Sequence, residues 1–262
     1  MVSYAAGQKG RNYLFYTEYS SHKEYMSLRN LIHKGSYIDM DYIYGSLSNK
    51  GGENPFDYPA IASNQAEIIT VATNALTGET KYFDKSDIAQ DNYDIIKASC
   101  SIPVVCPPYI VKGTPYYDGA LSDPIPVEKA FAMGCDKVVL ILTRPKDFRR
   151  KPGKDRLIAS IIRRKYPKAA FRMERRADNY NALLDQAVNL ERQGKLLIIA
   201  PDDTCGMDTL TRDKEAMVRF YKKGLQDGGA ISLYLKKEQI LEQSGNYFLE
   251  RQNHKTDCRA YY

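Results

Sequence analysis

The chain has 262 residues, 43% of them hydrophobic, which is enough for one substantial core and does not require a second domain. Its five cysteines are scattered and form no Cys-x-x-Cys pair or Cys/His cluster, which indicates free thiols in a reducing compartment and excludes a zinc site of the usual spacing. The formal charge of +6 is uneven, because residues 144–176 hold 14 Lys or Arg against 3 Asp or Glu, a local +11 that leaves −5 for the rest.

No stretch of the sequence approaches the roughly 20 consecutive apolar residues of a membrane-spanning helix, and the start lacks a basic region followed by a long apolar run. The sequence therefore predicts a cytoplasmic protein whose contact with membranes, if any, is peripheral. Residues 2–6 followed by Gly7 are typical of the last turn of a helix with a glycine stop. Because nothing before them could begin that helix, we expect a preceding segment to be missing.

Three short apolar runs rich in branched residues predict strands that are buried on both faces. They are residues 67–73, 137–143 and 195–200. The last two follow helical stretches that end at Gly134 and Gly194, and such helix-to-strand alternation predicts a mostly parallel central sheet flanked by helices. We expect this α/β architecture to form one domain over residues 1–235, followed by a polar tail over residues 236–262 that has no assigned function.

A helix and a hairpin are expected between the first and second of these runs. Residues 91–101 have a helical pattern, and the helix should stop near Pro103, because the proline ring disfavours a helical conformation in the residue before it. Residues 111–117 are prone to form strands on both sides of Gly113, which predicts a short hairpin.

The hairpin leads into Asp118, a carboxylate at a corner of small residues and a candidate for a working base. Gly119 and Ala120 would leave room for another group to approach, and the preceding Tyr116 and Tyr117 could partly exclude water. An Asp-Gly dipeptide by itself is more typical of a turn than of a catalytic site.

A second carboxylate, Asp123, stands directly before Pro124. An Asp N-cap followed by proline in the first turn is a common way to open a helix. We therefore expect a structural cap at Asp123 rather than a catalytic group.

The same region resembles the distal active-site half of bacterial patatin-like phospholipases. The motifs that carry the resemblance, in matching order and spacing, are Ala98-Ser99-Cys100-Ser101-Ile102-Pro103, Pro107-Pro108, Tyr117-Asp118-Gly119-Ala120 and Asp123-Pro124-Ile125-Pro126. Residues 7–12 and the turn at residues 77–79 also resemble that group, so that the likeness extends from Val2 to about Leu235.

This resemblance implies a lipid acyl hydrolase with a Ser-Asp dyad that uses no metal and no cofactor. Asp118 matches the aspartate of the family's Asp-Gly-Ala motif, with Gly119 and Ala120 shaping the corner. The nucleophile would be a serine in Gly-x-Ser-x-Gly, and its oxyanion would be held by a glycine-rich loop. Neither element is present in the sequence. We therefore expect the first strand or strands, the oxyanion loop and the nucleophile elbow to be missing, and the chain to be inactive as written.

Other catalytic chemistries find little support. A Ser-His-Asp triad or a Cys-His pair needs a histidine, and His22, His33 and His254 lie in polar segments without motif context. Cys100 and Cys106 are more typical of small buried hydrophobic residues than of a nucleophile or a metal pair. No Gly-x-Gly-x-x-Gly or Walker-type loop is present, so no nucleotide cofactor is predicted.

The basic segment over residues 144–176 predicts an amphipathic helix with an apolar stripe beside a cationic flank. The stripe consists of Leu157, Ile158, Ile161 and Ile162, and the flank of Arg156, Arg163, Arg164 and Lys165. Such a helix could rest on anionic lipid or close over an acyl-chain pocket, or it could be an ordinary packed helix with a solvated face. The 21 tyrosines, many within residues 13–58, could line a lipid site or be half-buried surface aromatics.

Three functional interpretations follow. The leading one is a patatin-like hydrolase of phospholipid or another acyl ester, of which this chain carries the aspartate half. The second is a non-catalytic lipid-surface or regulatory protein that keeps the scaffold after losing the dyad. Nucleic-acid binding through residues 144–176 is disfavoured, because no recognised reading motif is present.

Overall fold

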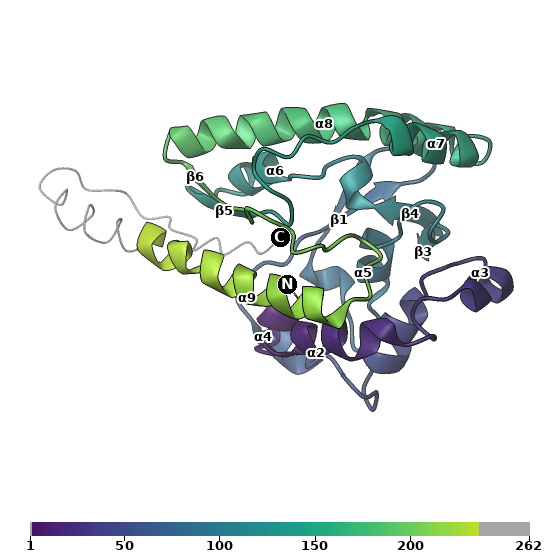
Figure 1. Ribbon diagram of the computed structural model, residues 1–262. Coiled ribbons are helices and arrows are strands. Elements are labelled where there is room, and N and C mark those ends of the chain that lie inside the picture. The colour runs from purple at the N-terminus through teal and green to yellow at the C-terminus, as the bar shows by residue number, and fades with distance from the viewer. Residues whose placement is uncertain (1, 236–262) are drawn as a thin grey trace, which may run out of the picture. The chain divides into compact units, whose positions relative to one another are not determined.

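The computed structural model describes residues 2–235 (Figure 1). The chain divides into two compact units. Within the described residues, the first unit comprises residues 2–125 and 149–183, and the second comprises residues 126–148 and 184–235. The expected tail over residues 236–262 lies outside the described residues, and the expected single domain over residues 1–235 stays a prediction.

The first unit is built around a four-stranded antiparallel sheet with the strand order β2-β1-β4-β3. Its strands are β1 (Thr70–Asn74), β2 (Thr80–Phe83), β3 (Tyr109–Val111) and β4 (Thr114–Asp118). The central pair, β1 and β4, sets Ala72 opposite Asp118 and Thr73 opposite Tyr117. The chain therefore reaches Asp118 at the end of a central strand.

The expectation of a mostly parallel central sheet is wrong for this unit. The turn around Gly78 joins β1 and β2 within a few residues, and the turn at Lys112 and Gly113 joins β3 and β4. Connections this short can only join antiparallel strands. An apolar run predicts burial on both faces, but it does not distinguish a parallel strand from a covered antiparallel one.

The second unit contains a parallel pair of strands, β5 (Val138–Ile141) and β6 (Leu196–Ile199). These are two of the three predicted strands, and each follows a helix and a glycine with positive φ, Gly134 or Gly194. The helix-to-strand alternation therefore predicted parallel pairing correctly where it occurs. The helices of this unit include α6 (Val127–Ala132), α9 (Lys214–Asp227) and the part of α8 that begins at Leu184.

The helices of the first unit are mostly short. They are α1 (Val2–Ala5), α2 (Arg11–Thr17), η1 (Tyr19–Ser21), α3 (Leu28–Lys34), η2 (Tyr42–Leu47), α4 (Tyr58–Ser63), η3 (Lys85–Asp87), α5 (Asp94–Ser99), η4 (Gly119–Leu121), α7 (Gly153–Ile162) and the first part of α8 (Pro167–Arg192). The helix expected within residues 91–101 is α5, and the expected hairpin around Gly113 is formed by β3 and β4. Among residues 2–235, no helix combines the length and apolar character needed to cross a membrane.

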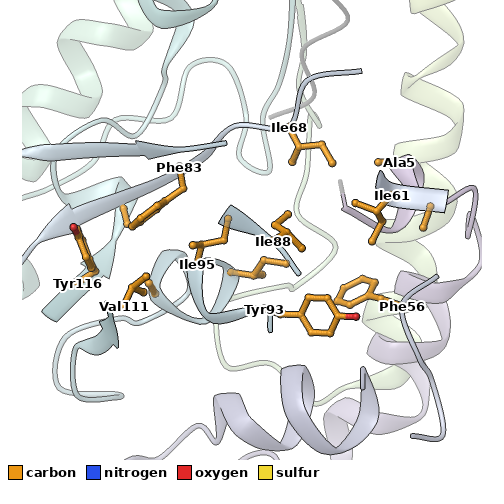
Figure 2. Packing of buried hydrophobic residues seen from close by; sticks show 14 residues of the cluster. Ala5, Phe56, Ile61, Ile68, Phe83, Ile88, Tyr93, Ile95, Val111 and Tyr116 are labelled. Atoms are coloured by element: carbon orange, nitrogen blue, oxygen red, sulfur yellow. The ribbon is translucent and has the colours of Figure 1, made fainter. Parts of the chain in front are cut away.

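One hydrophobic core lies between the sheet and α5 (Figure 2). Tyr93, just before α5, is fully buried and packs edge-on against Phe56 with ring centroids 4.9 Å apart. Phe83 of β2 makes a similar contact with Tyr116 of β4 at 5.2 Å. Aromatic pairs of this geometry add to the free energy of burial. The first pair joins the segment before α4 to the start of α5, and the second joins two strands of the sheet.

A second core covers the opposite side of β4 and involves α7 and α8. Because neighbouring residues of a strand point to opposite faces, Tyr116 belongs to the first core and Tyr117 to the second. The helix α8 presents Ala169, Ala170 and Met173 to this core, all fully buried. Small side chains on this face allow α8 to approach the sheet closely.

Candidate functional site

The backbone of Asp118 is fixed by hydrogen bonds from both sides. Its N–H donates to the carbonyl of Ser101 at 2.9 Å, and its own carbonyl accepts from Thr73 Oγ1 at 2.9 Å. Thr73 Oγ1 also lies 2.8 Å from the hydroxyl of Ser122. The residue at the end of β4 is therefore held on one side by Ser101, which follows α5, and on the other by Thr73 of β1.

The carboxylate of Asp118 begins the turn η4. Its Oδ1 accepts from the backbone N–H of Ala120 at 2.8 Å, as the side chain of an N-cap does. This bond fixes the side chain in one direction. The preceding Tyr116 and Tyr117 are both buried, as expected from the sequence.

The expectation that Gly119 leaves room for another group is wrong. A Cβ built on Gly119 would lie 2.5 Å from the carbonyl oxygen of Val71 and 2.8 Å from the Val71 Cβ. The missing side chain thus allows the backbone of η4 to pack directly on β1. At this position glycine serves close packing rather than access.

Two opposing effects act on the pKa of the Asp118 carboxyl. Burial raises the pKa of the carboxyl, while the Ala120 N–H and the charges of Arg176 and Arg150 act to lower it. Burial prevails, so the pKa lies above its usual value. A carboxylate is a better general base when its pKa is closer to neutral pH.

The expectation that Asp123 caps a helix is wrong. The helix α6 begins at Val127 after Pro126, and no side chain caps it. Pro126 disfavours a helical conformation in Ile125, which delays the start of the helix. Asp123 Oδ2 instead accepts from the hydroxyl of Tyr82 at 2.5 Å, a contact between β2 and a residue 41 positions later.

Two arginines and one aspartate form a charged cluster close to this corner. Asp155 is 2% exposed and accepts two bonds from the guanidinium of Arg150, at 2.7 and 2.9 Å. Arg176 Nη1 lies 3.8 Å from the same carboxylate. In the sequence these residues stood out only as part of the basic segment over residues 144–176, and the cluster was not predicted.

The helix α8 contributes three hydrogen-bond donors that were not predicted from the sequence. Arg176 and Asn179 each donate to a backbone carbonyl of the corner after Asp118, and Arg172 donates to a carbonyl in the turn between β1 and β2. Their spacing of four and three residues places them on one side of the helix. That spacing indicates a polar side of the helix, but the sequence does not show which distant backbone carbonyls these side chains bind.

Neither Cys100 nor Cys106 has the properties of an activated nucleophile. Burial raises the pKa of Cys100 to about 12 and that of Cys106 to about 11, so both remain protonated at neutral pH. His22 Nδ1 lies 2.7 Å from the hydroxyl of Tyr42, and His33 is exposed near the end of α3. His254 lies outside the described residues. Within residues 2–235, no three His, Cys, Asp or Glu side chains group to hold a metal ion.

Two regions of the chain match known protein families. Residues 3–131 match the model of the family described as patatin-like phospholipase. Residues 166–237 match a domain of unknown function, DUF6363. The first region contains the whole Asp118 corner, and the second contains all of α8 and α9.

Proposed function

Residues 3–131 belong to the patatin-like phospholipase family, and from this premise we propose that Asp118 is the general base of a Ser-Asp lipid acyl hydrolase. The family implies a lipid acyl ester as the substrate. The observation that supports a working role for Asp118 is its combination of a fixed backbone, a directed carboxylate and a pKa raised by burial.

The proposed chemistry follows from what an ester requires. A serine hydroxyl is a weak nucleophile, so Asp118 would take its proton as the oxygen attacks the ester carbonyl. Backbone N–H groups would stabilise the resulting oxyanion. The 262 residues contain no Gly-x-Ser-x-Gly motif, and we propose that they do not hydrolyse esters by themselves.

The first experiment is to determine the intact mass and N-terminal sequence of the protein made by its native host. Hydrolysis of phospholipid and of short acyl esters is then measured for that protein and for its Asp118→Asn variant. We expect the substitution to lower kcat by roughly a thousandfold or more, as loss of a base partner does in hydrolytic dyads and triads.

Asp123→Asn is the matched control, because it makes the same chemical change five residues away. Circular dichroism should show that both variants keep the fold. Hydrolysis that survives in Asp118→Asn would exclude Asp118 as the base. A native protein without any hydrolytic activity would exclude the enzyme and favour the second function below.

The second candidate is binding to an anionic lipid surface without catalysis, and the exposed part of α7 favours it. Leu157 is 65% exposed and Ile161 is 58% exposed, whereas Ile162 of the same predicted stripe is buried. On α8, Phe171 is 54% exposed. We call these three side chains, together with the cations Arg163, Arg164 and Lys165 between the helices, the α7–α8 basic face.

Co-sedimentation with vesicles tests this candidate. Replacing Arg163, Arg164 and Lys165 by glutamine should weaken binding to phosphatidylserine vesicles roughly a hundredfold, at about 1 kcal/mol for each cation. Glutamine at Lys9, Lys23 and Arg29, three exposed cations elsewhere in the first unit, is the matched control. Equal losses in the two triple variants would contradict a specific face. A gel shift with nucleic acid at low salt would favour the third interpretation instead.

A further inference from the structure

Three side chains of α8 donate hydrogen bonds to backbone carbonyls in two loops of the sheet, one of which directly follows Asp118. Arg172 Nε donates to the carbonyl of Gly78 at 2.7 Å, Arg176 Nε to that of Ala120 at 3.1 Å, and Asn179 Nδ2 to that of Ser122 at 3.0 Å. Ala120 and Ser122 belong to the corner after Asp118, and Gly78 lies in the turn between β1 and β2. One side of a single helix therefore binds two separate loops of the sheet.

Close packing holds α8 against these two loops. Met173 and Ala177, between the donors, are fully buried. A Cβ on Gly78 would lie 3.0 Å from the carbonyl oxygen of Lys168, so the β1–β2 turn is already in contact with the backbone of α8. Because a packed interior leaves little free volume, the helix cannot shift without losing these contacts.

The backbone of Ala120 connects α8 to the carboxylate of Asp118. The N–H of Ala120 donates to Asp118 Oδ1, and the carbonyl of Ala120 accepts from Arg176. The residue that orients the carboxylate is therefore itself held by α8. Reorienting Ala120 would break both bonds.

The guanidinium of Arg176 is also held in place. It is largely buried and lies near Asp155, which Arg150 binds through two hydrogen bonds. Asn181 of α8 fixes the backbone of Arg150 in turn, accepting from its N–H at 2.9 Å and donating to its carbonyl at 3.1 Å. The cluster thus links α8 to the start of the α7 segment.

We infer that α8 is a positioning element for Asp118 and that Arg176 is its main positioning residue. Because α8 lies within residues 166–237, the region that matches DUF6363 completes a corner of the region that matches the patatin-like phospholipase family. The catalytic consequence rests on the proposed function, whereas the positioning itself does not.

The test compares Arg176→Gln with Arg172→Gln in this chain. Both variants remove an arginine of α8 that donates to a backbone carbonyl, but only Arg176 binds the Asp118 corner. The pKa of Asp118 is measured by NMR titration of its carboxyl carbon. We expect the pKa to rise in Arg176→Gln, where a nearby positive charge is lost, and to stay unchanged in Arg172→Gln.

Amide hydrogen exchange gives a second readout that does not depend on charge. Exchange of the Ala120 N–H should become about tenfold faster or more in Arg176→Gln and remain unchanged in Arg172→Gln. Arg176→Lys, which keeps the charge but not the planar guanidinium, should restore the pKa more fully than the exchange rate. If Arg176→Gln fails to fold, Asn179→Ala removes the neutral bond to Ser122 and should still accelerate exchange at this corner.

The same pKa and exchange rate in Arg176→Gln and Arg172→Gln would overturn the inference. In the native protein, Arg176→Gln should also lower kcat/KM roughly ten- to a hundredfold through misplacement of the base. The acidic limb of its pH profile should move to higher pH. If Asp118→Asn keeps its activity, the proposed function fails, but the NMR comparison still decides whether α8 positions Asp118.

Discussion

At the scale of single residues, Gly119 gives a direct test of close packing at the corner. In Gly119→Ala the new methyl group would meet the Val71 carbonyl at 2.5 Å, so β1 or η4 must move. We expect a loss of about 2–3 kcal/mol in the free energy of unfolding, the usual cost of overpacking. Urea denaturation measures it. Gly153→Ala, in open space at the start of α7, should leave stability unchanged or slightly raised.

The raised pKa of Asp118 predicts a pH-dependent cost in stability. Because the folded chain holds this proton more tightly than the unfolded chain, stability falls as the pH rises from the unfolded pKa through the folded one. Asn in place of Asp keeps the acceptor for the Ala120 N–H and removes the buried charge. Thermal unfolding should therefore show Asp118→Asn more stable than the original chain at pH 7. The difference should shrink toward pH 3, and a difference that grows on acidification would contradict this sign.

At the scale of elements, α8 packs on β4 mainly through apolar contacts. Met173 is fully buried among Tyr117, Ala169 and Ala170. Met173→Ala should cost about 2–4 kcal/mol, because the helix cannot collapse fully into the space that is left. Phe171→Ala, two residues away on the exposed side, should change stability by no more than about 0.5 kcal/mol. Chemical denaturation of the two variants provides the comparison.

The elements also show which parts of the fold are visible in the sequence. The helix α5, the β3–β4 hairpin and the parallel pair β5 and β6 were predicted, because local periodicity, proline and glycine determine them. The antiparallel direction of β1 was not, since its partners depend on the short turns that follow and on β4, more than 40 residues away. Local patterns indicate what an element is, but only its neighbours decide how it pairs.

The candidate site shows the same difference between local patterns, which the sequence reveals, and distant contacts, which it does not. The motif predicted Asp118 as the base, and that role stays a prediction, whereas the expectations for Asp123 and Gly119 were wrong. Tyr82 lies on β2 and Val71 on β1, far from Asp123 and Gly119 in the sequence. The donors of α8 were missed for the same reason, because Arg176 and Ala120 are 56 positions apart. Contacts of this range become visible only in three dimensions.

At the scale of the whole molecule, the distribution of charge predicts how the chain would meet a membrane. Residues 144–176 carry +11 and the rest −5, so an anionic surface would attract one segment and repel the remainder. Binding that begins with this attraction should weaken steeply between about 0.05 and 0.5 M salt, as the screening length shortens. Binding that comes from the insertion of apolar side chains into the membrane should depend much less on the salt concentration.

The α7–α8 basic face allows the two contributions to be separated. Replacing Leu157 and Ile161 by serine should weaken vesicle binding at every salt concentration, because these side chains supply buried apolar area rather than charge. The triple glutamine variant at Arg163, Arg164 and Lys165 should instead resemble the original chain at high salt and differ from it at low salt. If both variants responded to salt in the same way, the exposed apolar residues would not enter the membrane, and attraction alone would account for binding.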